Sequence, residues 1–346
     1  MLCINDHNTD PYFNLAAEEH VLKNFAHDCF MLWRNGPSVI VGRHQNTLAE
    51  INMDYVTRNN IKVVRRLSGG GAVFHDLGNL NFTFIETAKS DRPVDFQKYT
   101  QPIIAVLRSL GVDARFEGRN DLVIGGRKFS GNAECVHRGR VLHHGTLLFA
   151  SELADLSGAL NANPEKFTGK AVKSVPGRVT NISSHLKQPL GLEEFRDRVL
   201  GHVMEAGTAR SAARGGFGET ALPCESRELY AYTGADIAAI NKLRETKYAT
   251  WEWNFGRSPG YNMANDLRTG GGRIETRLDV QNGIIRHARI FGDFFAIADI
   301  AVLEQLLAGT PHTEAGIRRK LAQVNLSDYL VNITEDELVE VCSPAK

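Results

Sequence analysis

The sequence has few cysteines, and they do not form a recognisable pattern. Its five cysteines are scattered over 346 residues, and their odd number argues against a disulfide framework. No two of them have the spacing of a zinc site. Because unpaired thiols are typical of a reducing compartment, we expect a cytoplasmic protein.

Long apolar runs and an excess of charge are also absent. No stretch reaches the roughly 18 apolar residues that a membrane-spanning helix needs. The N-terminus lacks the patterns of a signal or transit peptide. Forty basic residues balance forty acidic ones, so no global field attracts nucleic acid or a membrane, although a local basic site remains compatible with neutrality. We therefore expect neither of these partners.

The sequence does carry two successive patterns of secondary structure, and its length suggests two domains. Short apolar runs with helices between them dominate the first part, which predicts an α+β fold with a mixed or antiparallel sheet. Further on, two alternating runs flank Asn282-Gly283, a strong hairpin signal, and helical patterns follow. We place the boundary near residues 245–250, which gives domains 1–246 and 250–346.

An early β-hairpin is also predicted. Phe30 to Trp33 and Ser38 to Val41 are short apolar runs, and Asn35-Gly36-Pro37 between them is a turn signal. The aromatic stretch Trp251 to Phe255 lies at the expected domain junction. It can be interpreted as a platform for a ligand or as packing between domains.

The most informative segment is the glycine-rich stretch at residues 65–76. Its three consecutive glycines let the main chain approach a ligand, and their N–H groups can face an anion. Arg65 and Arg66 beside them supply forked donors that suit phosphate. The segment is not a P-loop, because no Gly-Lys-Ser/Thr and no helix follow it. A flexible turn between two strands is the alternative interpretation.

A second segment, residues 118–131, offers a carboxylate and a lysine. Asp121 precedes an apolar run and can hold Mg2+ at a strand end, because hard cations prefer oxygen ligands. A surface aspartate in a turn is the alternative. Gly125-Gly126 predicts a hairpin that presents Lys128. A lysine on an inward face is costly unless it meets an anion, whereas a solvated hairpin lysine needs no partner.

Two adjacent histidines and a cysteine have competing interpretations. His143 and His144 point to opposite faces of a strand, so we expect a core or supporting histidine rather than a metal pair. Cys135, near His137 and Arg138, can form a thioester intermediate only if its thiolate is stabilised. A thiol without a catalytic role is the alternative.

Taken in order, these segments resemble the lipoate–protein ligase family. The segments that carry the resemblance are Trp33 to Asn35, Val41 to Asn46, Arg65 to Asp76, Gly118 to Asp121, Arg127 to Gly131, His143 to Leu148, Ser174-Val175, Arg178 to Asn181 and Trp251 to Gly256. Together they cover nearly the whole chain. The resemblance implies a catalytic domain of the biotin–lipoate ligase fold and a smaller α+β C-terminal accessory domain.

The resemblance also implies a reaction in two steps. ATP activates lipoate as lipoyl-AMP with release of pyrophosphate, and a lysine of an acceptor protein then displaces AMP. Activation is needed because a carboxylate is a poor acyl donor, whereas a mixed anhydride has a good leaving group. The implied cofactors are ATP and Mg2+, and lipoate is the substrate. The implied partners are apo lipoyl domains of 2-oxoacid dehydrogenase E2 subunits and the glycine-cleavage H protein.

Individual residues match the family's functional positions. Lys128 matches the lysine that contacts both the α-phosphate and the lipoyl carboxyl, and Asp121 matches the magnesium site. The ATP and adenylate site is expected to comprise Arg66, Gly71, Ala72, Val73, Phe74, Asn120 and Lys128. The lipoate site is expected to comprise Lys128, Ser68, Gly70, His75 and His144. The loop that covers the adenylate is expected to contain Lys170, Lys173, Ser174 and Arg178.

Two transferase reactions remain as alternatives. One is an ATP-independent octanoyl or lipoyl transfer through Cys135. The other is a lipoyl transfer that uses lipoyl-AMP made elsewhere. The complete set of matched nucleotide positions and the accessory domain favour the ligase.

Overall fold

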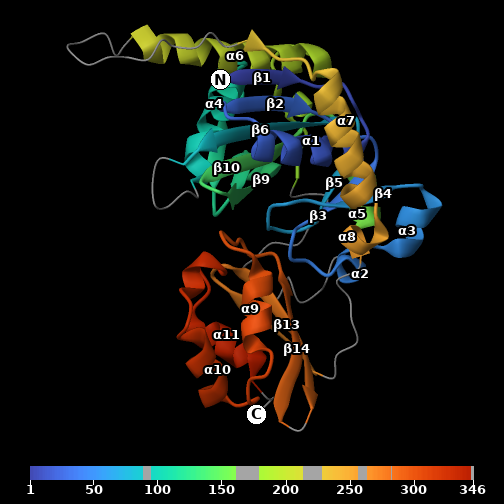
Figure 1. The fold of residues 1–346 in the computed structure, drawn as a ribbon. Helices are drawn as coiled ribbons and strands as arrows, with labels where there is room; N and C mark the ends of the chain where they lie inside the picture. Colours follow the sequence, from blue (N-terminus) through green and yellow to red (C-terminus); the bar gives the residue numbers. More distant parts are fainter. Residues whose placement is uncertain (89–94, 161–178, 213–227, 256–262, 282, 344–346) are drawn as a thin grey trace, which may run out of the picture. The chain divides into compact units, whose positions relative to one another are not determined.

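The structure is a computed structural model that describes residues 1–88, 95–160, 179–212, 228–255, 263–281 and 283–343. The chain divides into two compact units, each assembled from separate stretches of sequence (Figure 1). The described residues of the first unit lie within Met1–Ser38, Phe74–Ser157 and Ser174–Tyr248. Those of the second unit lie within Val39–Val73, Gly158–Lys173 and Ala249–Lys346.

A large mixed sheet, to which the described residues contribute eight strands, forms the first unit. Their order is β11 (Glu228–Leu229), β1 (Leu2–Asn5), β2 (Cys29–Trp33), β6 (Asn79–Thr87), β10 (Arg140–Leu148), β9 (Arg127–His137), β8 (Asp121–Ile124) and β7 (Ala114–Glu117). β1 is parallel to both of its neighbours, and the other pairs are antiparallel. This confirms the expected α+β fold with a mixed sheet.

Helices cover both faces of this sheet. The helices that the structure describes in this unit are α1 (Pro11–Asn24), α4 (Phe96–Ser109), the 3-10 helix η3 (Ile182–His185), α6 (Leu192–Ala212), α7 (Gly234–Leu243) and the π-helix η4 (Arg244–Tyr248), with α5 (Leu153–Ala159) at the unit boundary. Local signals set the helix starts, because Asp10 caps α1 just before Pro11 and Asp95 caps α4. None of the described helices is long and apolar enough to cross a membrane.

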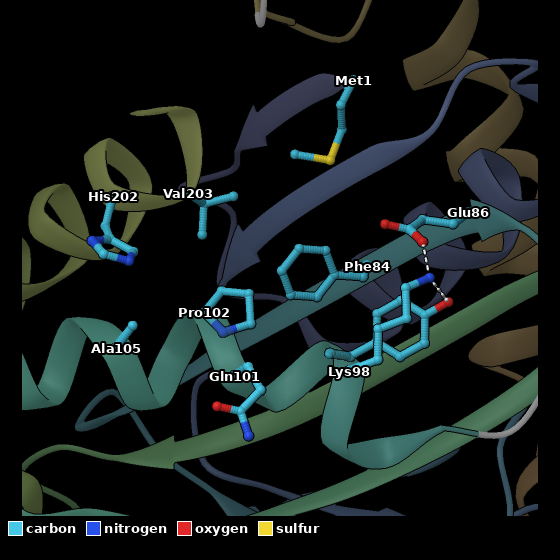
Figure 2. Close-up of a pocket in the computed structure, with 10 residues that line it drawn as sticks. Met1, Phe84, Glu86, Lys98, Gln101, Pro102, Ala105, His202 and Val203 are labelled. Atoms are coloured by element: carbon cyan, nitrogen blue, oxygen red, sulfur yellow. Dashed lines mark hydrogen bonds and ion pairs between the residues drawn. The ribbon is translucent and has the colours of Figure 1, made fainter. Parts of the chain in front are cut away.

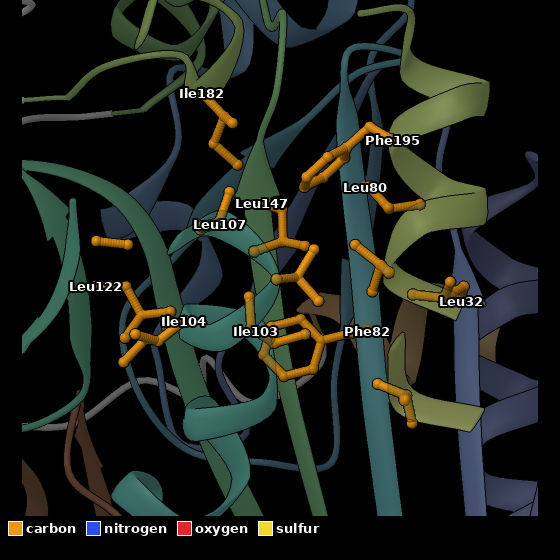
Figure 3. Close-up of a cluster of buried hydrophobic side chains, with 14 of the residues drawn as sticks. Leu32, Leu80, Phe82, Ile103, Ile104, Leu107, Leu122, Leu147, Ile182 and Phe195 are labelled. Atoms are coloured by element: carbon orange, nitrogen blue, oxygen red, sulfur yellow. The ribbon is translucent and has the colours of Figure 1, made fainter. Parts of the chain in front are cut away.

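The core of the first unit lies between the sheet and helices α4 and α6 (Figure 3). Leu80, Phe82 and Phe84 alternate along β6, so their side chains point to the same face. They meet Ile103 of α4 and Phe195 of α6, and all five are buried. The opposite face, which carries Thr83 and His144, packs against α1.

The predicted hairpin of Phe30 to Trp33 with Ser38 to Val41 is wrong in its pairing, although both strands are present. β2 pairs with β1 and β6, whereas β3 (Ser38–Val41) lies between β4 (Lys62–Arg65) and β5 (Val73–His75) in a separate sheet. Both strands are buried along their whole length. Each therefore takes neighbours on both edges, and an apolar run does not specify which neighbours these are.

The second unit contains this small sheet and the C-terminal part of the chain. Its helices and strands beyond β3 and β4 are α2 (Thr47–Glu50), α3 (Met53–Arg58), α8 (Trp251–Phe255), β12 (Met263–Thr269), β13 (Gly272–Gln281), β14 (Ile284–Gly292), α9 (Ile300–Leu307), α10 (Glu314–Leu321), η5 (Leu326–Asp328) and α11 (Glu335–Cys342). The antiparallel pairing of β13 with β14 confirms the predicted hairpin, although Asn282 itself lies outside the described residues.

A core of its own holds the C-terminal part together. Ile274, Leu278 and Ile290 of the sheet pack against Leu303 of α9 and Leu338 of α11, and all are buried. The expected smaller α+β C-terminal fold is thus confirmed. The exact division into domains 1–246 and 250–346 stays a prediction, since the second compact unit also takes in earlier stretches of the chain.

Truncating the first core should destabilise the protein. Leu147 is fully buried on β10, so Leu147→Ala should cost about 2–5 kcal/mol of unfolding free energy through lost burial and a residual cavity. Leu229→Ala is the matched control, because Leu229 is 60% exposed on β11 and its truncation should change stability by about 0.5 kcal/mol or less. Urea denaturation followed by circular dichroism measures both, and equal losses would contradict the assigned core.

Candidate active site

Lys128 and Asp121 form an ion pair across two neighbouring strands of the first unit. Lys128 Nζ lies 2.7 Å from Asp121 Oδ1, and their side chains are 40% and 37% exposed. Lys128 is the second residue of β9, and Asp121 is the first of β8. The structure thus brings together the predicted catalytic lysine and the predicted magnesium ligand at a place that solvent reaches.

The predicted Gly-Gly hairpin positions Lys128. Ile124 pairs with Arg127, so Gly125 and Gly126 form a two-residue turn. Both glycines have positive φ angles, 56° and 73°, as the mirror-image turn of a tight hairpin requires.

The main chain of Lys128 also pairs with a later part of the sequence. Val179 forms a parallel bridge with Lys128, and the Thr180 N–H donates to the Lys128 carbonyl at 2.9 Å. The Asn181 side chain accepts from the Ser151 N–H and donates to the Ser151 carbonyl, both at 3.0 Å. The residues predicted for the adenylate loop lie outside the described residues: Lys170, Lys173, Ser174 and Arg178. The residues that follow this loop are therefore fixed beside Lys128.

Asn120, in the turn before Asp121, is held by Asn132 of β9. The main-chain N–H and the side-chain Nδ2 of Asn132 both donate to the Asn120 carbonyl at 3.0 Å. The Asn120 side chain donates back to the Asn132 carbonyl. Three hydrogen bonds thus fix the turn that leads into the Lys128–Asp121 pair.

A buried polar group on the α1 face includes His144. Its Nδ1 lies 3.0 Å from Glu18 Oε1, and the Thr83 hydroxyl donates to the same oxygen at 2.6 Å. The Trp33 indole N–H donates to Thr83 Oγ1 at 2.9 Å. Sequence reasoning missed Glu18 and Thr83. A glutamate among the apolar residues of α1 was the available signal for Glu18, whereas nothing local marked Thr83.

His75 lies near the same tryptophan. The His75 and Trp33 rings are 6.3 Å apart, and His75 Nδ1 lies 3.1 Å from Asn35 Nδ2. Asn14 of α1 donates to Asn35 Oδ1 at 2.9 Å. The two histidines predicted for the lipoate site, His75 and His144, are therefore both linked to Trp33. Phe74, which precedes His75 in β5, is buried.

In the second unit, Arg66 shapes the glycine-rich segment. Its Nη2 donates to the carbonyls of Gly69 and Gly71 at 2.6 and 2.8 Å, and its Nε donates to Ser68 Oγ at 3.1 Å. Its Nη1 donates to the Ile40 carbonyl at 3.0 Å. The forked donors that suit a phosphate thus bind three main-chain carbonyls and the Ser68 hydroxyl here.

Arg65 has a structural role that the sequence did not reveal. Its guanidinium donates to the main chain of the turn after β3 and to Thr47 Oγ1, and it also donates to the carbonyls of Trp253 and Asn254 in α8. The Trp253 indole donates back to the Arg65 carbonyl at 2.8 Å. Arg65 is 1% exposed. These contacts favour the packing interpretation of the aromatic stretch at Trp251 to Phe255.

Close main-chain contact explains two of the three consecutive glycines. The Gly70 N–H donates to the Phe294 carbonyl at 3.4 Å, and a Cβ at Gly69 would lie 2.2 Å from that oxygen. Gly70 also has a φ of +86°. The Phe294 ring stacks on His44 with 4.8 Å between centroids. A side chain is therefore excluded at Gly69 and strained at Gly70.

The histidine that follows Cys135 in β9 does not supply the positive charge that an activated thiol needs. Cys135 is a half-buried residue of β9 opposite Leu142. Burial, together with Lys23 and Arg138, lowers the pKa of His137, so this histidine is uncharged at neutral pH and cannot stabilise a thiolate as a cation.

A cavity elsewhere in the first unit is separate from these residues. It has a volume of about 330 Å³ and is lined by Met1, Phe84, Glu86, Lys98, Tyr99, Gln101, Pro102, Ala105, His202 and Val203 (Figure 2). Its lysine is already bound to Glu86 and to the Tyr99 hydroxyl. None of the predicted site residues lines it.

No cluster of three or more His, Cys, Asp and Glu side chains suited to a metal ion occurs within the described residues. A cation at Asp121 would therefore take most of its oxygen ligands from water and a bound substrate, as Mg2+ commonly does.

Comparison with known families accounts for both parts of the chain. Residues 10–204 match the lipoyl protein ligase A/B catalytic domain, and residues 258–341 match the bacterial lipoate protein ligase C-terminus. The chain is 42% identical to lipoate–protein ligase 1 of Staphylococcus aureus, with 98% of both chains covered. It is 40% identical to the lipoate–protein ligase LplJ of Bacillus subtilis, with 99% of both covered. The chain therefore belongs to the lipoate–protein ligase family.

Solved structures agree in fold. The P. falciparum LipL1 structure in complex with lipoate has a TM-score of 0.79 at 24% identity and covers 99% of this chain and 98% of its own. A lipoate–protein ligase A bound with ATP has a TM-score of 0.60 at 25% identity, covering 73% and 98%. A bipartite ligase from Thermoplasma acidophilum, described with its E2 lipoyl domain, has a TM-score of 0.60 at 28% identity, covering 75% and 98%.

The buried guanidinium of Arg65 yields a stability prediction. A lysine has fewer donors and no planar fork, so Arg65→Lys should leave buried carbonyl oxygens without a donor and cost about 2–3 kcal/mol. Arg58→Lys, at an exposed position of α3 in the same unit, is the matched control and should be close to neutral. Thermal and urea denaturation measure both. Equal stability of the two variants would show that these hydrogen bonds contribute little.

Proposed function

We propose that this protein activates lipoate with ATP to form lipoyl-AMP and pyrophosphate, and then transfers the lipoyl group to a lysine of an acceptor protein. The observation that carries the proposal is the accessible Lys128–Asp121 pair. It lies in a chain whose relatives over its whole length are lipoate–protein ligases. A lysine and a carboxylate at this place provide one group for an anionic substrate and one for a cation.

In the first step, Lys128 stabilises negative charge. Its ammonium exchanges Asp121 for the lipoate carboxylate and the α-phosphate, which it holds together while charge moves between them. As a compact charge on a flexible stem, it can follow that movement. The half-exposed carboxylate of Asp121 fits the oxygen chemistry of Mg2+, which when bound would neutralise phosphate charge.

The nucleotide is proposed to bind along the glycine-rich segment. Main-chain groups of Gly71, Ala72, Val73 and Phe74 supply donors, and Arg66 supplies positive charge. Asn120 contributes from the turn that Asn132 fixes. The structure of a relative bound with ATP supports a nucleotide site in this fold.

The lipoate site is proposed to include Lys128 at its polar end, together with Ser68, Gly70, His75 and His144. The links of both histidines to Trp33 support their assignment to one site. We add Glu18 and Thr83 as residues that fix the orientation of the His144 ring. A largely apolar substrate suits a pocket with a few oriented polar groups.

In the second step, an acceptor lysine attacks the acyl carbon of lipoyl-AMP, and AMP leaves. Lys128 again stabilises the charge that develops on the phosphate and acyl oxygens. The loop with Lys170, Lys173, Ser174 and Arg178 would cover the adenylate and exclude water. The proposed acceptors are lipoyl domains of 2-oxoacid dehydrogenase E2 subunits and the glycine-cleavage H protein, and the E2 lipoyl domain described with the archaeal relative supports the former.

The proposed division of labour assigns the lipoate and ATP sites to residues 1–246 and an accessory role to residues 250–346. A match of residues 258–341 to the family's C-terminal part supports this division. The five scattered cysteines of the sequence, an odd number without a disulfide pattern, support a reducing cytoplasmic location.

A test of the ATP requirement separates this function from the transferase alternatives. Acceptor lipoylation from lipoate should require ATP and Mg2+ and release one pyrophosphate per modified lysine, as intact mass and pyrophosphate release will show. Cys135→Ser should keep most of this activity, because neither proposed step needs a thiol. The transferase would be established instead if an acyl carrier modified the acceptor without ATP. In that case the wild type should form a trapped acyl-thioester, and Cys135→Ser should lose the modification.

Lys128 should be needed for both steps. Lys128→Ala should slow adenylate formation and the use of supplied lipoyl-AMP by about 10²–10³-fold each, since one oriented electrostatic contact contributes about that much. Lys128→Arg should rescue poorly, because a planar fork does not replace a compact ammonium. Arg127, the exposed residue before Lys128, supplies the control, and Arg127→Ala should have little effect on either rate. Wild-type rates for folded Lys128→Ala would show that Lys128 is only a solvated hairpin residue.

A further inference from the structure

A chain of buried polar groups in the first unit leads from the start of α4 to the turn at Asn120. The Asp95 N–H donates to Glu134 Oε2 at 3.1 Å. Glu134 Oε1 lies 2.8 Å from His143 Nδ1, and His143 Nε2 lies 3.2 Å from Asn132 Oδ1. The far end of the chain is the Asn132–Asn120 pairing beside Asp121. Neither proposed chemical step uses Glu134 or His143.

The surroundings of this chain are apolar and aromatic. His143 is fully buried, and Glu134 and Asn132 are each 2% exposed. Rings of Tyr99, Phe82 and Phe96 lie around His143, with centroids 4.9, 5.8 and 5.8 Å from its own. A charge on Glu134 or on His143 would therefore be energetically costly.

Burial makes the uncharged forms of both partners dominant at neutral pH. It raises the pKa of Glu134 to about 8, against the opposing effect of the Asp95 N–H and the Lys98 ammonium. It also lowers the pKa of His143 well below its usual value.

Other charged groups around Glu134 do not change this result. Asp95, the N-cap of α4, adds negative charge that raises the pKa of Glu134, and Lys98 of α4 is bound to Glu86 of β6 (Figure 2). The Tyr99 hydroxyl accepts from Lys98 at 3.2 Å. His144, next to His143 on β10, faces Glu18 instead. Protonated Glu134 beside neutral His143 is therefore the resting pair.

Only one direction of proton donation satisfies every group in this chain. Asn132 Nδ2 donates to the Asn120 carbonyl and to Ser130 Oγ, so Asn132 Oδ1 must accept. The His143 proton is then on Nε2, which leaves Nδ1 as an acceptor. Glu134 must supply the hydrogen to Nδ1 from its own carboxylic acid. Its other oxygen accepts from the Asp95 N–H.

The main chain leaves room for this arrangement. A Cβ at Gly145 would lie 2.2 Å from Asn132 Oδ1 and 2.5 Å from the Phe82 ring. Any other residue there would displace the amide that receives the His143 proton. Glycine at this position of β10 is therefore required by the orientation of Asn132.

We propose that Glu134, as a protonated acid, and His143 are positioning residues that orient Asn132 and thereby fix the Asn120–Asp121 turn for adenylate formation. This inference rests on the proposed function, because it assigns the Asn120–Asp121 turn to the nucleotide site. If Glu134 loses its carboxylic hydrogen, the hydrogen bond between Glu134 and His143 is either lost or reversed in direction. Asn132 is then no longer held in one orientation, and the turn beside Lys128 loses its preorganisation.

The test compares Glu134→Gln with Glu134→Leu in the full chain. Glutamine keeps a donor toward His143 Nδ1 and an acceptor for the Asp95 N–H, whereas leucine keeps neither. Lipoate-dependent ATP–pyrophosphate exchange is measured from pH 6 to 10, with kcat and KM determined separately. Glu228→Gln, at an exposed position on β11, is the control for loss of a glutamate.

For the kinetics, Glu134→Leu should lower kcat about tenfold or more with a smaller change in KM for lipoate. Glu134→Gln should stay within about twofold of wild type at pH 7. The wild type and Glu228→Gln should lose kcat as the pH rises through about 8, where Glu134 ionises. Glu134→Gln should lack this fall. A wild-type kcat for folded Glu134→Leu, or an unchanged alkaline fall in Glu134→Gln, would overturn the inference.

Stability provides a second readout that needs no ligase activity. A raised acid pKa means that the Glu134 proton stabilises the folded state fully below about pH 4.5, and that this contribution is lost as the pH rises through about 8. The urea midpoint of the wild type should therefore fall relative to Glu134→Gln between these values. If the difference between the two urea midpoints stayed constant across this range, Glu134 would not be a protonated acid in the folded protein and the inference would be overturned.

The outcomes also separate this inference from the function on which it rests. If the wild type shows no lipoate-dependent exchange, the proposed function fails and the positioning role fails with it. If the wild type exchanges normally while the Glu134 variants match it, only the positioning role is overturned.

Discussion

The register of β10 between β6 and β9 is the constraint on which the first unit depends. Because adjacent residues of a strand face opposite sides, this register sends His143 toward α4 and His144 toward α1. On one side of the sheet His143 contacts Glu134 and Asn132, and on the other side His144 contacts Glu18. A shift by one residue would exchange the two histidines and leave both sets of buried polar groups without partners.

In the second unit, the neighbouring residues Arg65 and Arg66 stabilise the glycine-rich segment through different sets of hydrogen bonds. Arg66 gathers the carbonyls of the segment itself, and Arg65 joins the turn after β3 to α8. Each guanidinium donates to several main-chain oxygens at once, and no neutral side chain has as many donors. The glycines complete the arrangement, since a Cβ at Gly69 would collide with the main chain at Phe294.

The first of these arrangements reaches the turn beside the proposed Lys128–Asp121 pair, because His143 meets Asn132 and Asn132 binds Asn120. Lys128 and Asp121 are among the more exposed residues of the proposed site, yet partly buried hydrogen bonds fix the chain beside them. In the proposed function, these hydrogen bonds would hold the two charged groups in place before a substrate binds. Such preorganisation is the main source of electrostatic stabilisation in enzymes.

The sequence by itself determined the family, the mixed sheet and the C-terminal hairpin, because these depend on local turns, on periodicity and on the order of short motifs. It also predicted the reacting groups, and these stay a prediction. Only the tertiary structure decided that β2 and β3 lie in different sheets, that Arg65 binds α8, and that Glu134 faces His143. Partners such as Glu18 and His144 are 126 residues apart in sequence. No local pattern specifies such a pairing, since it exists only where strand register and helix packing bring the two side chains together.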